Sequence, residues 1–246
     1  MIGSRVPRDS PQRGLFPEPH CMFLEAHSIS CVKGFDLEVT LENSSGDELV
    51  LCVPASDLYA EVGKWRGLRK DSPEIWRPLA RKSIFKPRSQ VESDPSFKQL
   101  ISYTMFVASK RIFVMKRLDT QGEKRLHGLL SIGVGGHMNP VPSLPWPSRR
   151  RISDIKAIVG LNTIREIREE VALAGNPGVA ILGFLNDDQN EVGRVHLGVV
   201  SMVRLTSPLL AVRENDKMQG AWVEISKVHA LGNFETWSSL VLNSIA

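Results

Sequence analysis

The sequence predicts an α+β sandwich fold. Runs that alternate apolar and polar residues, as half-buried strands do, dominate the chain from about residue 97 onward. Helical patterns interrupt these runs without the regular βαβ alternation of a parallel doubly wound sheet. The length of 246 residues is enough for one large domain, or for one domain with appendages.

The first 46 residues are predicted to form a poorly ordered extension. Four prolines fall among the first 19 residues, and no long amphipathic pattern forms before a short alternating run at residues 35–41. We therefore expect a folded domain at residues 47–246, with an N-terminal subregion at 47–96 and a core at 97–246.

The N-terminal subregion opens with a strand-like run, ELVLCV, at residues 48–53, and a helix is predicted at residues 55–62. The stretch at residues 64–95 is polar and punctuated by prolines. Loops and a short helix that wrap the core are expected there.

The core is predicted to begin near Phe97 with a hairpin. Its strands are expected at residues 103–108 and 111–116, with Ser109-Lys110 as the turn. A helix should end near Gly175 and Pro177, because both residue types stop helices. The remaining predicted elements are a strand at 129–134, that helix at about 161–173, strands at 179–185, 195–205 and 221–225, and a terminal helix at about 234–245.

Composition points to a globular protein of the cytoplasm. Hydrophobic residues make up 42% and charged residues 24% of the chain, which is ordinary for a soluble domain. No run approaches 18 apolar residues, and no apolar stretch follows the early arginines, so neither a membrane span nor a secretory signal is expected. The three cysteines are too few to suggest a disulfide framework.

Charge gives a weak indication of partners. The formal net charge is +4, and much of the excess lies at residues 64–88 and in the triplet Arg149, Arg150 and Arg151. Such patches can bind nucleic acid, attract a polyphosphate or solubilise a surface. No recognised nucleic-acid motif accompanies them, so a nucleic-acid partner is not favoured.

The most informative residues are the six at positions 165–170, REIREE. On a helix, Glu166, Glu169 and Glu170 lie at i, i+3 and i+4 and share one face. Carboxylates this close raise one another's pKa values unless a cation neutralises them, and hard oxygen ligands suit Mg²⁺ or Mn²⁺. The alternative is a solvated helix face on which Arg165 and Arg168 pair with the glutamates.

The context of this helix resembles the Nudix hydrolase family. The family's box contains R-E-U-x-E-E, with U aliphatic, and residues 165–170 match it residue for residue. Gly135-Gly136 resembles the glycine pair that opens the box, Leu173 stands at its last aliphatic position, and Trp222-Val223 resembles a frequent late strand. The resemblance covers about residues 47–246 and implies an α/β/α sandwich with a mixed sheet.

Further marks resemble a bacterial Nudix branch loosely called predicted phosphoesterases. These marks are Phe97-Lys98-Gln99, the run EKRLHG at 123–128, Gly135-Gly136-His137, Asn186-Asp187-Asp188 and Val195-His196-Leu197-Gly198.

Three features depart from the family pattern. Gly136 lies 29 positions before Arg165, about twice the usual spacing, so an insert of roughly 15 residues within 140–155 is expected to enlarge the loop. By spacing, the first box glutamate would fall at Pro142 or Ala157, and neither is acidic. Ala172 replaces the last box glycine.

The resemblance implies roles for individual residues. Glu166, Glu169 and Glu170 would bind the metal, and Arg165 would orient them by ion pairing. The general base is left open, because Nudix enzymes vary in its position. A helix glutamate, Glu169 or Glu170, or a loop acid, Glu214 or Glu191, could serve.

The resemblance also implies a phosphate-binding set. Gly135, Gly136 and His137 would line the pocket, and His196 could shape it, although a lone histidine near a strand end more often has a structural role. Either Arg117 or Arg125 would draw in the polyanion, since guanidinium suits bidentate phosphate contacts.

The function these features favour is divalent-metal-dependent hydrolysis of a phosphoanhydride or phosphoester, with a nucleoside-diphosphate-linked compound as the expected small-molecule substrate. A second reading is a non-catalytic Nudix-fold module that senses a nucleotide, which the missing first glutamate favours and the intact helix glutamates disfavour. A third, nucleic-acid binding, rests on basic patches alone. The expected setting is cytoplasmic, with no membrane partner and possible homodimers.

Overall fold

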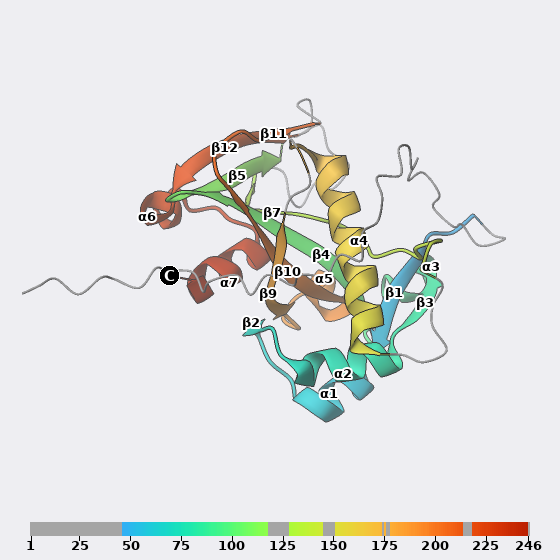
Figure 1. Ribbon diagram of the computed structural model, residues 1–246. Helices are drawn as coiled ribbons and strands as arrows, with labels where there is room; N and C mark the ends of the chain where they lie inside the picture. The colour runs from blue at the N-terminus through green and yellow to red at the C-terminus, as the bar shows by residue number, and fades with distance from the viewer. Residues whose placement is uncertain are drawn as a thin grey trace, which may run out of the picture.

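A large mixed sheet runs through the molecule (Figure 1). The computed structural model describes residues 46–117, 128–144, 151–173, 175, 178–213 and 218–245. The main path of the sheet has the order β12-β5-β4-β10-β9-β2. Strands β4 and β10 pair in parallel, from His196 beside Gln99 to Leu205 beside Ala108, and the other described pairs of this sheet are antiparallel.

The strands differ widely in length, and the longest two form the centre of the sheet. They are β1 (Leu49–Pro54), β2 (Gly67–Lys70), β3 (Ile84–Pro87), β4 (Phe97–Ala108), β5 (Arg111–Arg117), β6 (Leu130–Ser131), β7 (Gly133–Val134), β8 (Val171–Ala172), β9 (Val179–Asn186), β10 (His196–Leu205), β11 (Ala211–Val212) and β12 (Met218–Glu224). Strands β8 and β11 form a separate two-stranded sheet.

The helices surround this sheet. They are α1 (Ala55–Val62), α2 (Pro73–Lys82), α3 (Arg88–Val91), α4 (Ile152–Glu170), α5 (Glu191–Val195), α6 (Ile225–Val228), the short 3-10 turn η2 (His229–Leu231) and α7 (Thr236–Ile245).

Two apolar clusters place helices on opposite faces of the sheet. On one face, α1, α2 and α4 pack on Leu100 and Val199. On the other, α6 and α7 pack on Tyr103 and Val200. Because side chains alternate between the faces of a strand, these neighbouring positions face opposite sides. The α+β fold with helices on both faces of a mixed sheet, as predicted, is therefore confirmed.

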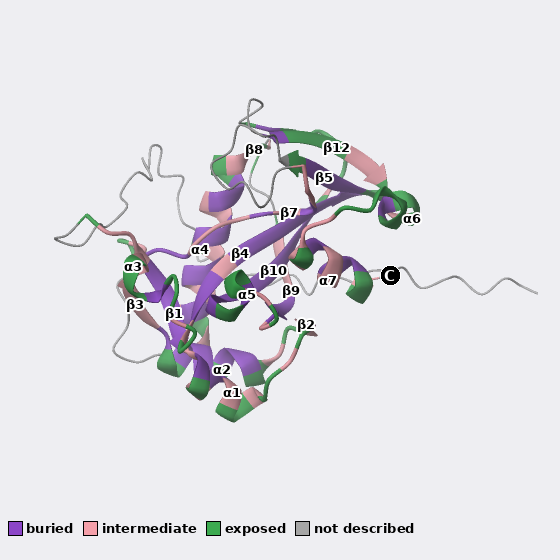
Figure 2. Cartoon of the chain, turned by 180° about the vertical axis from the view of Figure 1, so that it is seen from behind, coloured by how far each residue is buried: buried purple, intermediate pink, exposed green. Residues whose placement is uncertain are grey.

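Strands β4 and β10 are buried on both faces, as Figure 2 shows along most of their length. Helices cover both sides, so both strands can carry near-continuous apolar runs instead of strict alternation. This central pair fixes where the ends of β4 and β10 lie, and both ends matter for the chemistry described below.

The N-terminal subregion is more regular than predicted. Loops and a short helix were expected at residues 64–95, whereas β2, α2, β3 and α3 occupy much of this stretch. Pro73 does not break the chain but begins α2, at a helix position whose N–H needs no partner. Ile75, Trp76 and Leu79 then give α2 a buried face, which outweighs the cost of Pro78 inside the helix.

Helix α4 begins earlier and ends sooner than predicted. The expected bounds were about 161–173, but the helix spans Ile152–Glu170. The backbone N–H of Arg151 donates to the Asp154 carboxylate, 3.0 Å away, and Ile155 and Val159 are buried. Part of the insert is therefore helix, not an enlarged loop. At the other end Val171 is extended and enters β8, so the helix stops before Gly175.

Strand β4 begins at Phe97, well before the predicted start at 103, and the strand predicted at 129–134 is divided into β6 and β7. The other predicted elements match within a few residues. The predicted extension lies outside the described residues, apart from Gly46. Within the described ranges, no helix is both long and apolar enough to cross a membrane.

A buried ion pair joins β4 to the segment that follows β9. The ammonium of Lys98, whose side chain is 1% exposed, lies 2.6 Å from Asp188 and donates to the carbonyl of Gly193. Burial lowers the pKa of Lys98, and the neighbouring Asp188 carboxylate opposes that shift. The carboxylate of Asp188 and the carbonyl of Gly193 therefore give the buried ammonium close polar partners.

Replacing Asp188 with Asn should lower the free energy of unfolding by about 2 kcal/mol, because the variant removes the carboxylate that contacts the buried Lys98 ammonium and leaves only the charge of Asp187 to favour it. Urea denaturation at pH 7 measures the change. Asp57→Asn is the matched control: its pair with Lys82 is solvent-exposed, so the loss should stay below about 1 kcal/mol. Equal losses in the two variants would show that the buried pair contributes no more to the free energy of unfolding than the exposed pair does.

Candidate functional site

The glycine pair brings the loop before α4 against both β4 and the helix. A Cβ on Gly135 would lie 1.7 Å from the carbonyl oxygen of Ser102, so any side chain there would force the backbones apart. The carbonyl of Gly136 accepts a hydrogen bond from the N–H of Ser102 at 2.9 Å. A Cβ on Gly136 would lie 2.7 Å from the Glu166 carboxylate. Gly136 thus leaves room for that carboxylate, and Gly135 lets the loop lie close to β4.

Arg165 is the centre of the polar contacts around this loop. Its guanidinium donates to Glu166 at 2.7 Å and to Glu169 at 3.2 Å. The same group donates to the carbonyl of His137 at 2.8 Å and to the side chain of Asn139 at 2.7 Å. Arg165 therefore holds two of the three helix glutamates and the loop in one arrangement, consistent with the orienting role the resemblance implies.

Glu166 is the buried member of the three. Burial raises the pKa of Glu166 to about 7; the charge of Arg165 opposes this shift, and those of Glu169 and Glu170 add to it. The three carboxylates are therefore close enough to repel one another, as helix spacing predicted. Glu169 is exposed and Glu170 is half-buried, so the set opens from α4 toward solvent.

The raised pKa of Glu166 has a consequence for stability in metal-free protein. The folded state retains a proton on Glu166 that the unfolded chain loses near pH 4.5, so this group favours folding at low pH, and the benefit is lost as the pH rises toward 7. The advantage of Glu166→Gln over the wild type should therefore grow by roughly 2–3 kcal/mol between pH 5 and pH 8.

Urea denaturation of both proteins in EDTA measures that difference. The comparison is needed because His137, with its pKa lowered to about 4 mainly by burial, gives the opposite pH dependence in both proteins. A constant difference between the two proteins across this pH range would contradict the burial of a titrating Glu166.

The remaining predicted site residues have varied outcomes. Arg125 and Glu214 lie outside the described residues. Arg117 ends β5 and pairs with Met218 across the sheet. Glu191 begins α5 and lines a hollow with Glu92, and none of the three α4 glutamates lines it. The roles of these residues stay predictions.

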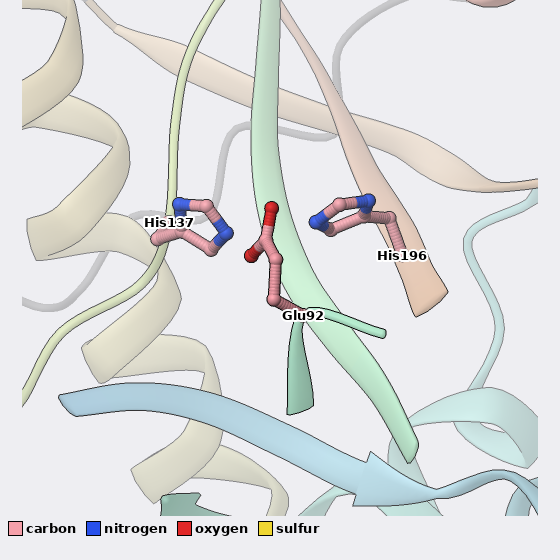
Figure 3. Close-up of side chains that lie close together, drawn as sticks. All are labelled: Glu92, His137 and His196. Carbon is pink, nitrogen blue, oxygen red and sulfur yellow. The ribbon is translucent and has the colours of Figure 1, made fainter. Parts of the chain in front are cut away.

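His137 and His196 lie together in the structure, and a third residue, Glu92, lies with them (Figure 3). No sequence pattern singled out Glu92. The two imidazole centroids are 5.6 Å apart, and the Glu92 carboxylate projects between the rings. One ligand atom from each residue lies within 4.8 Å of the others. Burial lowers the pKa of both histidines, which favours their neutral form.

A chain of polar contacts links this cluster to Arg165. Arg88 donates to both Glu92 and Glu48, at 2.9 and 3.1 Å. The amide of Asn139 donates to Glu48, and Arg165 donates to the same Asn139 side chain. The α4 glutamates and the Glu92, His137 and His196 cluster therefore occupy neighbouring, connected regions.

Comparison with known proteins finds a sequence relative and solved structures to which this chain is similar. Protein YmaB of Bacillus subtilis (strain 168) is 31% identical over 207 residues, covering 80% of this chain and 97% of YmaB. The crystal structure of Tm1382, described provisionally as a Nudix hydrolase, is 26% identical with a TM-score of 0.62, covering 80% of this chain and 98% of Tm1382.

A third likeness is weaker. The Nudix domain of NrtR from Shewanella oneidensis, solved with ADP ribose, is 11% identical with a TM-score of 0.42, covering 60% of this chain and 86% of that one, which is too low to carry an argument. No protein-family model matches the chain.

Proposed function

This chain belongs to the family of protein YmaB and has a Nudix fold, and on that premise we propose that it is a divalent-metal-dependent hydrolase of a phosphoanhydride or phosphoester. The proposed substrate class is a nucleoside-diphosphate-linked small molecule. Mg²⁺ or Mn²⁺ would be held by Glu166, Glu169 and Glu170.

One observation carries this proposal: the Glu166 carboxylate lies over Gly136 beside the guanidinium of Arg165, with two further carboxylates on the same helix face. Carboxylates this close repel one another, and the charges of Glu169 and Glu170 add to the raised pKa of Glu166. A Mg²⁺-sized ion would offset their charge with the oxygen ligands it prefers. The donor set therefore fits such an ion.

Each residue of the proposed site would have a separate role. Arg165 fixes the orientation of Glu166 and Glu169, so that their oxygens need no rearrangement when substrate binds. Gly136, with no side chain, lets the Glu166 carboxylate lie against the loop that would line the phosphate pocket. When bound, the metal would neutralise phosphate charge and lower the pKa of attacking water. Glu169 or Glu170 could accept the proton of that water.

The lost first box glutamate favours one competing function. Position 157, eight residues before Arg165, is an alanine inside α4. A site with one carboxylate fewer could bind a nucleotide without hydrolysing it. The Nudix-fold sensing module is therefore the second candidate, and the test below separates the two.

The test is a hydrolysis screen with purified full chain and Mg²⁺ or Mn²⁺. The panel contains nucleoside triphosphates, dinucleoside polyphosphates, sugar nucleotides and cofactor pyrophosphates, and phosphorus NMR identifies the products. We expect turnover of at least one nucleoside-diphosphate-linked compound, abolished by EDTA and restored by Mg²⁺. Nucleotide binding without turnover would support the sensing module, and turnover unaffected by EDTA would contradict metal dependence.

A further inference from the structure

We propose that Glu92, His137 and His196 form a second metal site, separate from the α4 glutamates, which takes a transition-metal ion of the Zn²⁺ class. The three side chains come from different parts of the chain. Glu92 follows α3, His137 lies in the loop before α4, and His196 begins β10 (Figure 3).

The sheet itself brings the two histidines to one face. His196 lies opposite Gln99 in the pairing of β10 with β4, and His137 bridges Ile101 on the other edge of β4. Paired residues share a face, and so do residues two apart along one strand. His137 and His196 therefore project to the same side of β4, where the Glu92 carboxylate meets them.

The distances between the three ligand atoms are close to those around a bound metal ion. One ligand atom from each residue already lies within 4.8 Å of the other two. Around a tetrahedral ion with bonds of about 2.0–2.2 Å, ligand atoms are roughly 3.4 Å apart. The Glu92 side chain is exposed, so a rotation about its own bonds can close the remaining gap without moving the sheet.

The hydrogen bonding of the histidines leaves their ligand atoms available. His196 is 8% exposed, and its Nδ1 lies 2.7 Å from the carbonyl of Val192. A carbonyl only accepts, so Nδ1 carries the proton and Nε2 of the neutral ring has a lone pair. This backbone bond is the kind that fixes the tautomer of metal-binding histidines.

The lone pair of His196 Nε2 has no hydrogen-bond partner within the described ranges, and neither has Nε2 of His137. Oε1 of Gln99, opposite His196 on the same face, is also buried without a partner there. A buried polar atom without a partner costs about 1–3 kcal/mol, so three on one face call for a bound group. A cation bound by the two imidazoles gives a partner to two of these three atoms, Nε2 of His137 and Nε2 of His196.

One side of the site is open. A hollow of about 470 Å³ is lined by Glu92 and His196 together with Glu191 and Arg194. Metal sites that bind an exchangeable ligand have three protein ligands and one free coordination position. The hollow would leave such a position accessible here. The guanidinium of Arg194 suits an anion at that position.

Donor chemistry separates the two sites. Imidazole nitrogen favours Zn²⁺, Co²⁺ and similar ions, whereas all-oxygen sets favour Mg²⁺ and Mn²⁺. Excess Mg²⁺ should therefore occupy the α4 glutamates while leaving the Glu92, His137 and His196 cluster free for Co²⁺.

The test is a Co²⁺ titration of chelator-stripped full chain in excess Mg²⁺, followed by visible absorption. We expect one equivalent to bind with the absorption of a nitrogen-ligated, low-coordinate ion, and Zn²⁺ to displace it. His137→Gln and Glu92→Gln should each weaken the affinity by about 10- to 10²-fold. The Glu92 variant alters an exposed group, so its circular dichroism should match the wild type even if the histidine variant folds poorly.

Two controls isolate the site. His229→Gln changes an exposed histidine of η2 and should leave Co²⁺ affinity unchanged. Glu170→Gln alters the other metal site and should also retain the Co²⁺ spectrum, whether or not the chain hydrolyses phosphates. Absence of Co²⁺ binding in the wild type, or equal affinity in the wild type and the folded Glu92→Gln protein, overturns the proposal.

Discussion

Replacing Glu170 with glutamine should lower metal-dependent hydrolysis by about 10²- to 10³-fold, the loss typical when one element of preorganised charge stabilisation is removed. The amide keeps the shape of the side chain but not its charge, and a Mg²⁺ ion depends on that charge. Glu169→Gln should give a comparable loss. The Glu169 side of its ion pair with Arg165 is largely exposed, so Glu169→Gln should lower the free energy of unfolding by less than about 1 kcal/mol.

Initial rates over a Mg²⁺ titration, for the substrate found in the screen, measure this effect. Glu224→Gln is the matched control, because Glu224 is an exposed acid at the end of β12 that pairs with Lys227. Its rate should equal that of the wild type. Full activity in both helix variants would exclude the α4 glutamates as the metal ligands.

Arg165→Met should remove most activity, by about 10²-fold, and also destabilise the protein. The substitution leaves Glu166, the His137 carbonyl and the Asn139 side chain without their shared donor. Loss of the guanidinium would also raise the pKa of Glu166 further, which disfavours the charged form that binds metal. Because Arg165 is 26% exposed, the loss in free energy of unfolding should be about 2–3 kcal/mol, below that of a fully buried pair.

Arg77→Met, at an exposed position of α2, is the control for removing an arginine from a helix. It should change both stability and rate little. Urea denaturation and initial rates, measured on both variants, distinguish the two positions. If Arg165 acts through its charge alone, Arg165→Lys should retain part of the activity and stability that Arg165→Met loses. If it acts through the several directed donors of the guanidinium, Arg165→Lys should retain little of either.

Local pattern was enough to predict much of the fold. The hairpin of β4 and β5, the helix α1 and the strands β9 and β10 follow from alternation, turn residues and apolar runs close together in sequence. The grouping of Glu166, Glu169 and Glu170 also follows, because helix geometry alone brings positions i, i+3 and i+4 to one face.

Long-range pairing could not be predicted in the same way. The parallel register of β10 on β4 places His196 and His137 on one face, and no feature within either segment encodes that register. Glu92 reaches the pair from just after α3, in a stretch expected to hold loops and a short helix, and no local pattern joins it to two distant histidines. The early start of α4 was missed because Ile155 and Val159 acquire their burial from tertiary contacts with α2 and β4.

The most direct test of the central claim is to locate Mn²⁺ by anomalous diffraction in crystals of the full chain grown with MnCl₂. The account predicts a peak within bonding distance of the carboxylates of Glu166, Glu169 and Glu170, beside Gly136. It also predicts loss of that peak in Glu170→Gln crystals grown under the same conditions. Mn²⁺ bound elsewhere with these three carboxylates uncoordinated, or a peak unchanged by Glu170→Gln, would contradict it.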